Sequence, residues 1–147
     1  MDTPLTRWYC DVCKKPIEDI DRGYVIWRSD EAGKDCDFKI IHQVDCDIDS
    51  FPSSLPLRDF LGPRGLVVLT SLLSLGPIKM HFGPSYNRVA DMNGLVDLMR
   101  RVQVPHYEEA RHRLFSNEKY LDDNDDANEV GPYLVDQLRA ALERYGK

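Results

Sequence analysis

The chain has 147 residues, of which 42% are hydrophobic, and its formal net charge is −6. This length and apolar content can bury a real core, either in one compact domain or in a small module joined to a larger one. The acidic balance argues against broad, nonspecific binding of nucleic acid, because that kind of binding depends on neutralising many phosphates.

The charge is distributed unevenly along the chain. Residues 1–50 carry seven Lys and Arg against twelve Asp and Glu, residues 51–116 carry eight against five, and residues 117–147 carry four against eight. The middle third can therefore present a local basic patch on an acidic protein.

The composition does not predict a segment that enters a membrane. The first residues lack the basic region and apolar stretch of a secretory signal, and even the apolar run Leu66–Leu69 is too short to span a bilayer. We therefore expect a cytoplasmic protein without membrane contacts. In that compartment, four cysteines indicate metal or redox chemistry rather than a disulfide framework.

The first motif is Cys10-Asp11-Val12-Cys13, which is followed by two lysines and a turn that ends in a proline. Two cysteines at this spacing can chelate one tetrahedral zinc ion as a zinc knuckle, and the lysines offset the thiolate charge. Segments 23–28 and 38–41 are then rich in β-branched and aromatic residues. With the polar connection between them, they predict a hairpin of two strands.

The second ligand pair requires a choice, because Cys36 and Cys46 compete for the last position. At about 3.3 Å per residue in an extended strand, Cys36 would lie roughly 20 Å from His42. Cys46 follows His42 by four residues, and a tight loop or a first helical turn can bring both side chains to one ion. We therefore predict a zinc site formed by Cys10, Cys13, His42 and Cys46, and we set Cys36 aside.

The full pattern, Cys-x2-Cys-x28-His-x3-Cys, resembles that of the broad group of zinc-ribbon and treble-clef domains over residues 8–50. The resemblance implies that a knuckle, a hairpin and a second ligand pair enclose one zinc ion, and it implies no particular partner. A set of three cysteines and one histidine closes the tetrahedral shell, which favours structural over catalytic zinc. Two other interpretations stay open, namely reduced structural thiols near a strand-end histidine and a redox Cys-x-x-Cys motif.

From Phe51 onward, the strand-like runs give way to leucine-rich helical patterns. We therefore expect an α+β protein with a zinc-binding hairpin module in residues 1–50 and a helical domain in residues 51–147 packed against it. We expect a loop or short strand over 78–86, and a solvated loop rather than a calcium site in the acidic run 122–126. The pattern predicts about four to five helices, over 54–61, 63–75, 92–104 and 105–116 and from about residue 128 to 145, the last with Pro132 in its first turn.

The helix expected over 64–75 is apolar on most of its sides. Such a helix is either central to a core or part of a seam between copies of the chain. We favour the core position, and homo-oligomerisation through this helix stays a second possibility.

The positive charge of the middle third comes mainly from arginines. One interpretation is a preference of cations for helix C-termini, combined with solvated helix faces. The other is an anion-recognition surface for a nucleic-acid backbone, an acidic protein segment or a phosphate ligand. The candidate residues are Arg88, Arg100, Arg101, Arg111 and Arg113.

These patterns lead to three functional hypotheses. The first is a non-enzymatic, zinc-stabilised regulatory or adaptor protein that binds a macromolecular partner, most simply another protein. The second is a DNA-binding transcriptional regulator whose central helices form a helix-turn-helix-like core. The third is a hydrolase-type enzyme, for which Glu108 and Glu109 beside His106 and His112 form the nearest constellation.

Overall fold

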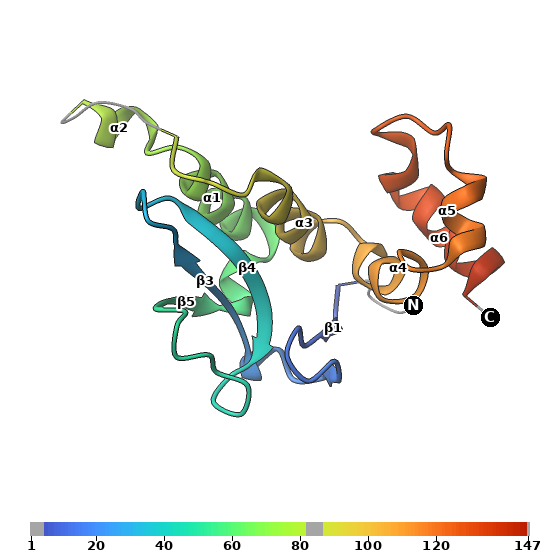
Figure 1. Cartoon of the computed structure of the whole chain (residues 1–147), viewed down its shortest axis with the longest axis horizontal. Helices are drawn as coiled ribbons and strands as arrows, with labels where there is room; N and C mark the ends of the chain where they lie inside the picture. The colour runs from blue at the N-terminus through green and yellow to red at the C-terminus, as the bar shows by residue number, and fades with distance from the viewer. Residues whose placement is uncertain (1–4, 82–86, 147) are drawn as a thin grey trace.

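The computed structural model describes residues 5–81 and 87–146. It shows an α+β protein in which two small antiparallel sheets come first and helices follow, which confirms the expected fold class. The sheets and the first helices occupy one end of an elongated molecule, and the last three helices gather at the other end (Figure 1). Within the described ranges, no helix has the length and apolar character needed to cross a bilayer.

The larger sheet contains the predicted hairpin. Strand β3 (Gly23–Ser29) pairs antiparallel with β4 (Asp35–His42), and a third strand, β5 (Ser53–Pro56), pairs with the other edge of β3. The helix predicted over 54–61 is therefore wrong in its first half, and only η2 (Leu57–Phe60) forms a 3-10 turn there. Because Pro56 disfavours helical backbone at the residue before it, this segment stays extended and joins the sheet.

The smaller sheet frames the first cysteine pair. Strand β1 (Trp8–Tyr9) pairs with β2 (Pro16–Ile17), so the Cys10–Cys13 motif lies in the loop between two short strands. A 3-10 turn, η1 (Ile20–Arg22), then leads directly into β3.

Three of the predicted helices form close to their expected bounds, because their apolar periodicity is regular. They are α1 (Gly62–Leu73), α3 (Met92–Gln103) and α4 (Tyr107–Leu114). Helix α2 (Gly76–Met80) replaces the expected loop or strand, since Pro77 suits a first helical turn. Residues 82–86 of that expected segment lie outside the described residues.

The C-terminal third differs more from the prediction. Helix α5 (Glu118–Asp123) forms in a mainly polar stretch, because Asn117 caps it through the amide of Tyr120 and Tyr120 is buried. Pro132 starts a separate 3-10 turn, η3 (Gly131–Tyr133), and α6 begins only at Val135 and ends at Tyr145.

The buried side chains of the described residues form two clusters on either side of Val104. The first cluster joins the larger sheet to α1 and α3, and includes Val25, Ile40, Leu69 and Leu98. The second joins α4, α5 and α6, and consists of Tyr107, Ala110, Leu114, Tyr120 and Leu138. The core of the sheet therefore extends across the domain boundary that the sequence suggested.

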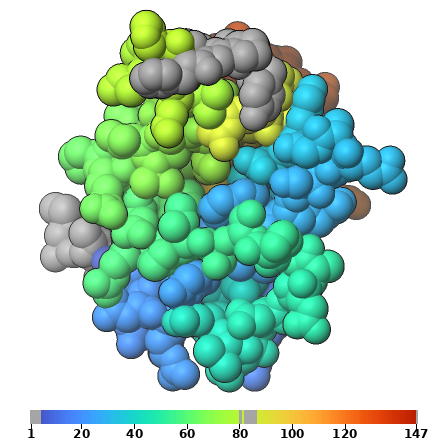
Figure 2. Space-filling view, turned by 90° about the vertical axis from the view of Figure 1, so that its left-hand side faces the viewer, coloured from blue at the N-terminus to red at the C-terminus, as the bar shows by residue number. Residues whose placement is uncertain are grey.

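Helix α1 is only partly a core helix. It buries Gly65, Leu69 and Leu72, whereas Leu66 and Val67 are 53% and 64% exposed. Figure 2 shows α1 on the surface, above the segment that leads into β5. An apolar helix face is thus left open to solvent.

Candidate metal centre

The loop between β1 and β2 positions the first two cysteines. The backbone amides of Val12 and Cys13 point at the sulfur of Cys10, at 3.4 and 3.5 Å. The loop closes because the amide of Lys14 donates to the carbonyl of Cys10 over 2.9 Å, with Lys14 in left-handed backbone at φ 68°. This is the geometry of a knuckle whose amides stabilise a thiolate.

A second turn positions the other two predicted ligands. His42 is the last residue of β4, and Val44 reverses the chain with φ 71°. The amide of Cys46 then donates to the carbonyl of His42 over 3.3 Å. As a result, the sulfur of Cys46 lies 3.9 Å from Nδ1 of His42.

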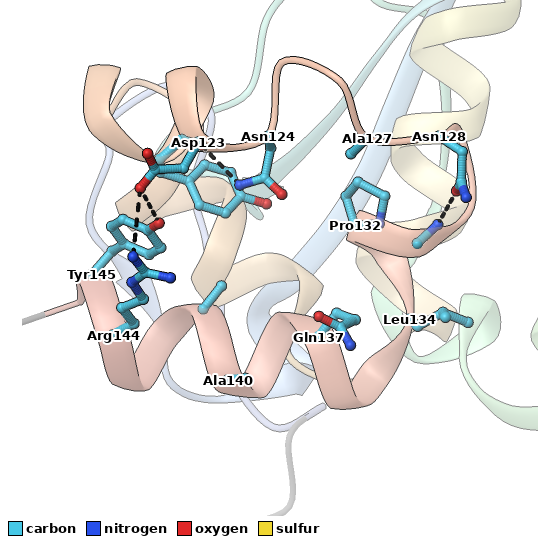
Figure 3. Close-up of a pocket in the computed structure, with 13 residues that line it drawn as sticks. Asp123, Asn124, Ala127, Asn128, Pro132, Leu134, Gln137, Ala140, Arg144 and Tyr145 are labelled. Carbon is cyan, nitrogen blue, oxygen red and sulfur yellow. Dashed lines mark hydrogen bonds and ion pairs between the residues drawn. The ribbon is translucent and has the colours of Figure 1, made fainter.

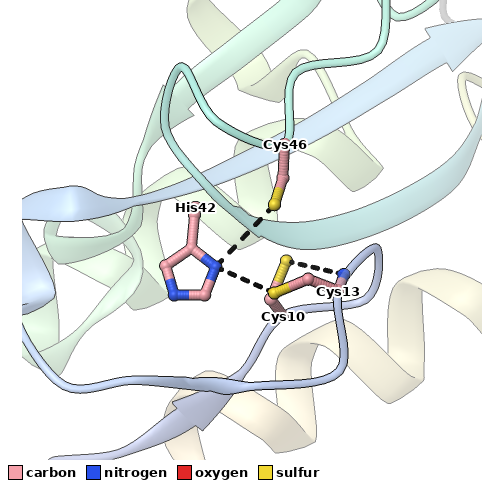
Figure 4. A group of neighbouring side chains, drawn as sticks. All are labelled: Cys10, Cys13, His42 and Cys46. Atoms are coloured by element: carbon pink, nitrogen blue, oxygen red, sulfur yellow. Dashed lines mark hydrogen bonds between the residues drawn. The ribbon is translucent and has the colours of Figure 1, made fainter.

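The two turns bring the four predicted ligands together, as Figure 4 shows, with all four ligand atoms within 4.8 Å of one another. The sulfur of Cys13 lies 3.3 Å from Nδ1 of His42. Sulfur and nitrogen ligands on one tetrahedral zinc ion lie roughly 3.6 Å apart, given zinc bonds of about 2.3 and 2.0–2.1 Å. The donor set therefore fits a metal ion of this kind.

The imidazole of His42 is oriented by the backbone behind it. Its Nε2 lies 3.1 Å from the carbonyl oxygen of Pro16, in the second strand of the small sheet. A carbonyl oxygen can only accept a hydrogen bond, so Nε2 carries the proton and the lone pair of Nδ1 faces the sulfurs. Metal-binding histidines are commonly held by such a contact on the far nitrogen.

Without a cation, the neighbouring sulfurs oppose the ionisation of Cys46. Burial raises the pKa of Cys46, and the sulfurs of Cys10 and Cys13 raise it further, to about 11. Burial also raises the pKa of Cys10, but hydrogen bonds from the amides of Cys13 and His42 outweigh that effect and lower it to about 6. A divalent cation between the sulfurs would allow all three cysteines to ionise, because it supplies the charge that they lack.

Cys36 lies apart from this centre. It faces Arg28 across the hairpin, it is buried, and burial raises the pKa of its thiol. All four cysteines of the chain are free thiols in this structure. Strand geometry predicted that Cys36 is not a ligand, and in the structure Cys36 lies outside the ligand cluster.

The sequence alone did not indicate that Asp11, between the two knuckle cysteines, connects the centre to the helices. One carboxylate oxygen of Asp11 accepts the amide of Ile40 over 2.8 Å and a guanidinium N–H of Arg101 over 2.7 Å. The amide of Asp11 in turn donates to the carbonyl of Ile40 over 2.8 Å. The knuckle is therefore fastened both to β4 and to α3.

Arg101 does not belong to a surface, contrary to the expectation that it helps to bind anions. It is 1% exposed, and its guanidinium donates to the carboxylate of Glu108 over 2.7 and 2.8 Å. Burial lowers the pKa of Arg101, but the hydrogen bonds and charges of Glu108 and Asp11 outweigh this and raise it above its ordinary value. The indole of Trp8 also donates to the carbonyl of Arg101, over 3.0 Å.

The other four candidate arginines each have a contact within the protein, and carboxylates neutralise two of them. Arg111 pairs with Asp97 at 2.9 Å and Arg113 with Glu109 at 3.0 Å, so carboxylates neutralise both. Arg88 donates to the carbonyl of Ser71 over 2.6 Å. The guanidinium of Arg100 lies 3.8 Å from the centre of the Tyr133 ring.

Three residues of the group considered for a hydrolase, Glu108, Glu109 and His112, make contacts that hold the fold together. Glu108 is the buried partner of Arg101, and Glu109 accepts the hydroxyl of Tyr9 over 2.6 Å. The ring of His112 stacks on Tyr9, with 3.6 Å between the ring centres. Burial and the contact with Glu109 raise the pKa of Tyr9. Because these contacts join α4 to β1, they support packing of the two ends of the molecule.

A separate hollow of about 410 Å³ lies between α5 and α6 (Figure 3). Its charged groups are compensated, because Asp123 accepts the hydroxyl of Tyr145 and lies 3.9 Å from Arg144. Two of its amide side chains are also engaged, since Asn124 donates to the carbonyl of Tyr120 and Asn128 accepts two backbone amides. The polar groups of this hollow therefore stabilise the loop between the two helices.

Comparison of the chain with protein-family models, with curated proteins and with solved structures finds no match. The candidate metal centre therefore rests on its ligand types and geometry.

Proposed function

We propose that the chain binds one zinc ion through Cys10, Cys13, His42 and Cys46, and that zinc stabilises a non-enzymatic regulatory or adaptor protein. The observation that carries the proposal is the four-ligand cluster with its oriented histidine. Three sulfurs and one imidazole suit zinc, which accepts tetrahedral coordination by soft ligands.

A structural role for the ion follows from the number of ligands. Four protein ligands complete a tetrahedral shell and leave no position for a water molecule or a substrate. Cys10 and Cys46 are buried, at 1% and 9% exposure, whereas Cys13 and His42 are partly exposed, so the ion would lie between the core and the surface. The ion would then hold the knuckle and the end of β4 in one arrangement.

Protein binding is the role that the surface favours. Leu66 of α1 is 53% exposed and lies with Val96 and Met99 of α3 around one apolar hollow. Exposed apolar side chains that gather on one face are typical of surfaces that bind other proteins. Binding of DNA has less support, because Arg101 is buried and Arg111 and Arg113 already pair with carboxylates.

The proposal is tested by affinity capture of the full-length chain from its native host, with and without nuclease, together with metal analysis of the purified protein. We expect about one zinc ion per chain and a stoichiometric protein partner that survives nuclease treatment. A partner that disappears with nuclease would instead support the DNA-binding hypothesis. Purified protein without zinc would contradict the metal assignment.

A further inference from the structure

An apolar groove lies between α1 and α3. It encloses about 280 Å³ and is lined by Leu66 and Leu69 from α1 and by Val96, Met99 and Arg100 from α3, with Gln103 at one end. Leu66 is 53% exposed, so the groove is open to solvent along α1. Met99 adds an unbranched side chain that can adapt to the shape of a bound residue.

The polar groups around the groove are already satisfied, which limits what can bind there. The amide of Gln103 donates to the carbonyls of Phe60 and Gly62, over 2.8 and 3.1 Å. The backbone groups in the middle of α1 and α3 bond within their own helices. An extended peptide would find no partners for its backbone there, whereas a helix satisfies its own backbone and needs only apolar contacts.

Arg100 gives the groove a charge preference. Among the described residues it is the only charged one that lines the groove, and it also lines an adjoining hollow of about 740 Å³ with Phe115, Glu129 and Tyr133. Its guanidinium stacks on Tyr133, and within residues 5–81 and 87–146 no carboxylate forms an ion pair with it. A bound segment with an acidic side chain at this point would supply the missing partner.

We propose that the α1–α3 groove binds an amphipathic helix of a partner protein, and that this helix places an Asp or Glu against Arg100. The proposal rests on the proposed adaptor function and names its surface. The apolar side chains of the partner would recur at positions i, i+3 or i+4, and i+7, since this spacing places them on one helix face. Ridges of the partner helix would then pack between the two helices of the groove.

The test is a selection of helical peptides from a randomised display library against the full-length, zinc-loaded chain. We expect enriched peptides to share the apolar helical spacing and one carboxylate. Leu66→Asp should weaken their binding about tenfold or more, because it places a charge in the groove. Val67→Asp is the matched control, since Val67 is on the same helix and 64% exposed but does not line the groove, and it should change binding less than about twofold.

The expected contact between Arg100 and an acidic residue of the partner helix is tested with a second variant. Repeating the selection with Arg100→Glu should replace the carboxylate of the enriched peptides with Lys or Arg. Peptides with the same acidic residue, or equal weakening by the two aspartate variants, would overturn the proposal. Circular dichroism and zinc content, measured for each variant, identify any that has lost its fold.

Two further outcomes separate this proposal from the adaptor function. A host protein that is captured equally well by Leu66→Asp would leave the adaptor function standing and remove the groove as its binding site. A dimer in sedimentation that Leu66→Asp converts to a monomer would show that a second copy of the chain occupies the groove, which would also overturn the proposal.

Discussion

The two buried clusters on either side of Val104 differ in size and in kind. Within the part of the chain that the structure describes, the first contains seventeen buried residues from the sheet, the knuckle and two helices, and the second contains five. The second relies on aromatic pairs, such as Tyr107 with Phe115 and Tyr120 with Tyr145, whose ring centres are 5.4 and 5.5 Å apart. A helical unit of about 40 residues with so small a core is marginal by itself. The comparison indicates that the C-terminal helices depend on their contacts with the N-terminal region.

Those contacts are mainly polar and buried. Arg101 and Glu108 form an ion pair in which both side chains are at most 3% exposed, and the amide of Tyr9 donates to the carboxylate of Glu108 over 3.0 Å. Removing one member of such a pair is costly, because the other charge stays buried without its partner. The junction should therefore be sensitive to single substitutions, although it is small.

The largest effect should come from breaking the metal centre in the larger cluster. We expect Cys13→Ser to remove bound zinc and to lower the free energy of unfolding by at least about 5 kcal/mol, because structural zinc contributes directly to folding. Thermal unfolding and metal analysis measure the two effects. Cys36→Ser is the control, since Cys36 is buried but lies outside the ligand cluster, and it should keep its zinc at a cost of about 1 kcal/mol.

The next largest effect should come from the junction. Glu108→Ala leaves Arg101 buried without its main partner, and we expect a loss of about 3–5 kcal/mol in the free energy of unfolding. Hydrogen exchange should show faster exchange in residues 107–145 than elsewhere. The control Glu143→Ala removes an exposed carboxylate on α6, away from the junction, and should change the free energy of unfolding by less than about 0.5 kcal/mol. Equal effects would contradict the assignment of Glu108 to the junction.

Substitutions that create a similar cavity in each cluster should show whether the two clusters unfold together. Leu69 and Leu138 are both fully buried, one in each cluster. We expect Leu69→Ala to lower the stability of the whole chain by about 2–5 kcal/mol. Leu138→Ala should instead reduce protection from hydrogen exchange in α4–α6 alone, by a similar or smaller free energy. If Leu138→Ala destabilised the sheet equally, the two clusters would behave as one cooperative unit.

The smallest effect concerns backbone strain at Val44, in the turn between His42 and Cys46. Val44 has φ 71° and is 73% exposed, a conformation that costs a β-branched residue about 1–2 kcal/mol. We expect Val44→Gly to raise the thermal unfolding midpoint, with a gain of up to about 1 kcal/mol. Val12→Gly, at an exposed position of the first knuckle without positive φ, should lower it. A loss of stability in both variants would argue against strain at Val44.

The sequence predicted those features that depend on local spacing. The ligand pair Cys10 and Cys13 and the pair His42 and Cys46 each form within one turn, and strand geometry was sufficient to set Cys36 aside. Helices α1, α3 and α4 followed from apolar periodicity over two to three turns. Zinc itself, the partner and the cellular compartment stay predictions.

The features that were missed depend on residues far apart in the chain. Strand β5 is four residues long, and its pairing with β3 decides its conformation more than its own sequence does. Arg101 gave the same local signal as the half-buried Arg100 beside it, because one of its two carboxylate partners, Asp11, is 90 residues away. The position of Asp11 between Cys10 and Cys13 was the sequence feature that could have pointed to a cationic partner such as Arg101.

The position of Asp11 makes metal binding and helix docking thermodynamically linked. The same short loop presents sulfur ligands at Cys10 and Cys13 and the carboxylate that pairs with Arg101. If ordering of that loop favours both events, each must strengthen the other by the same factor. The zinc affinity of the chain would then depend on whether its C-terminal helices are docked. A partner that displaced those helices would weaken zinc binding by the same coupling free energy.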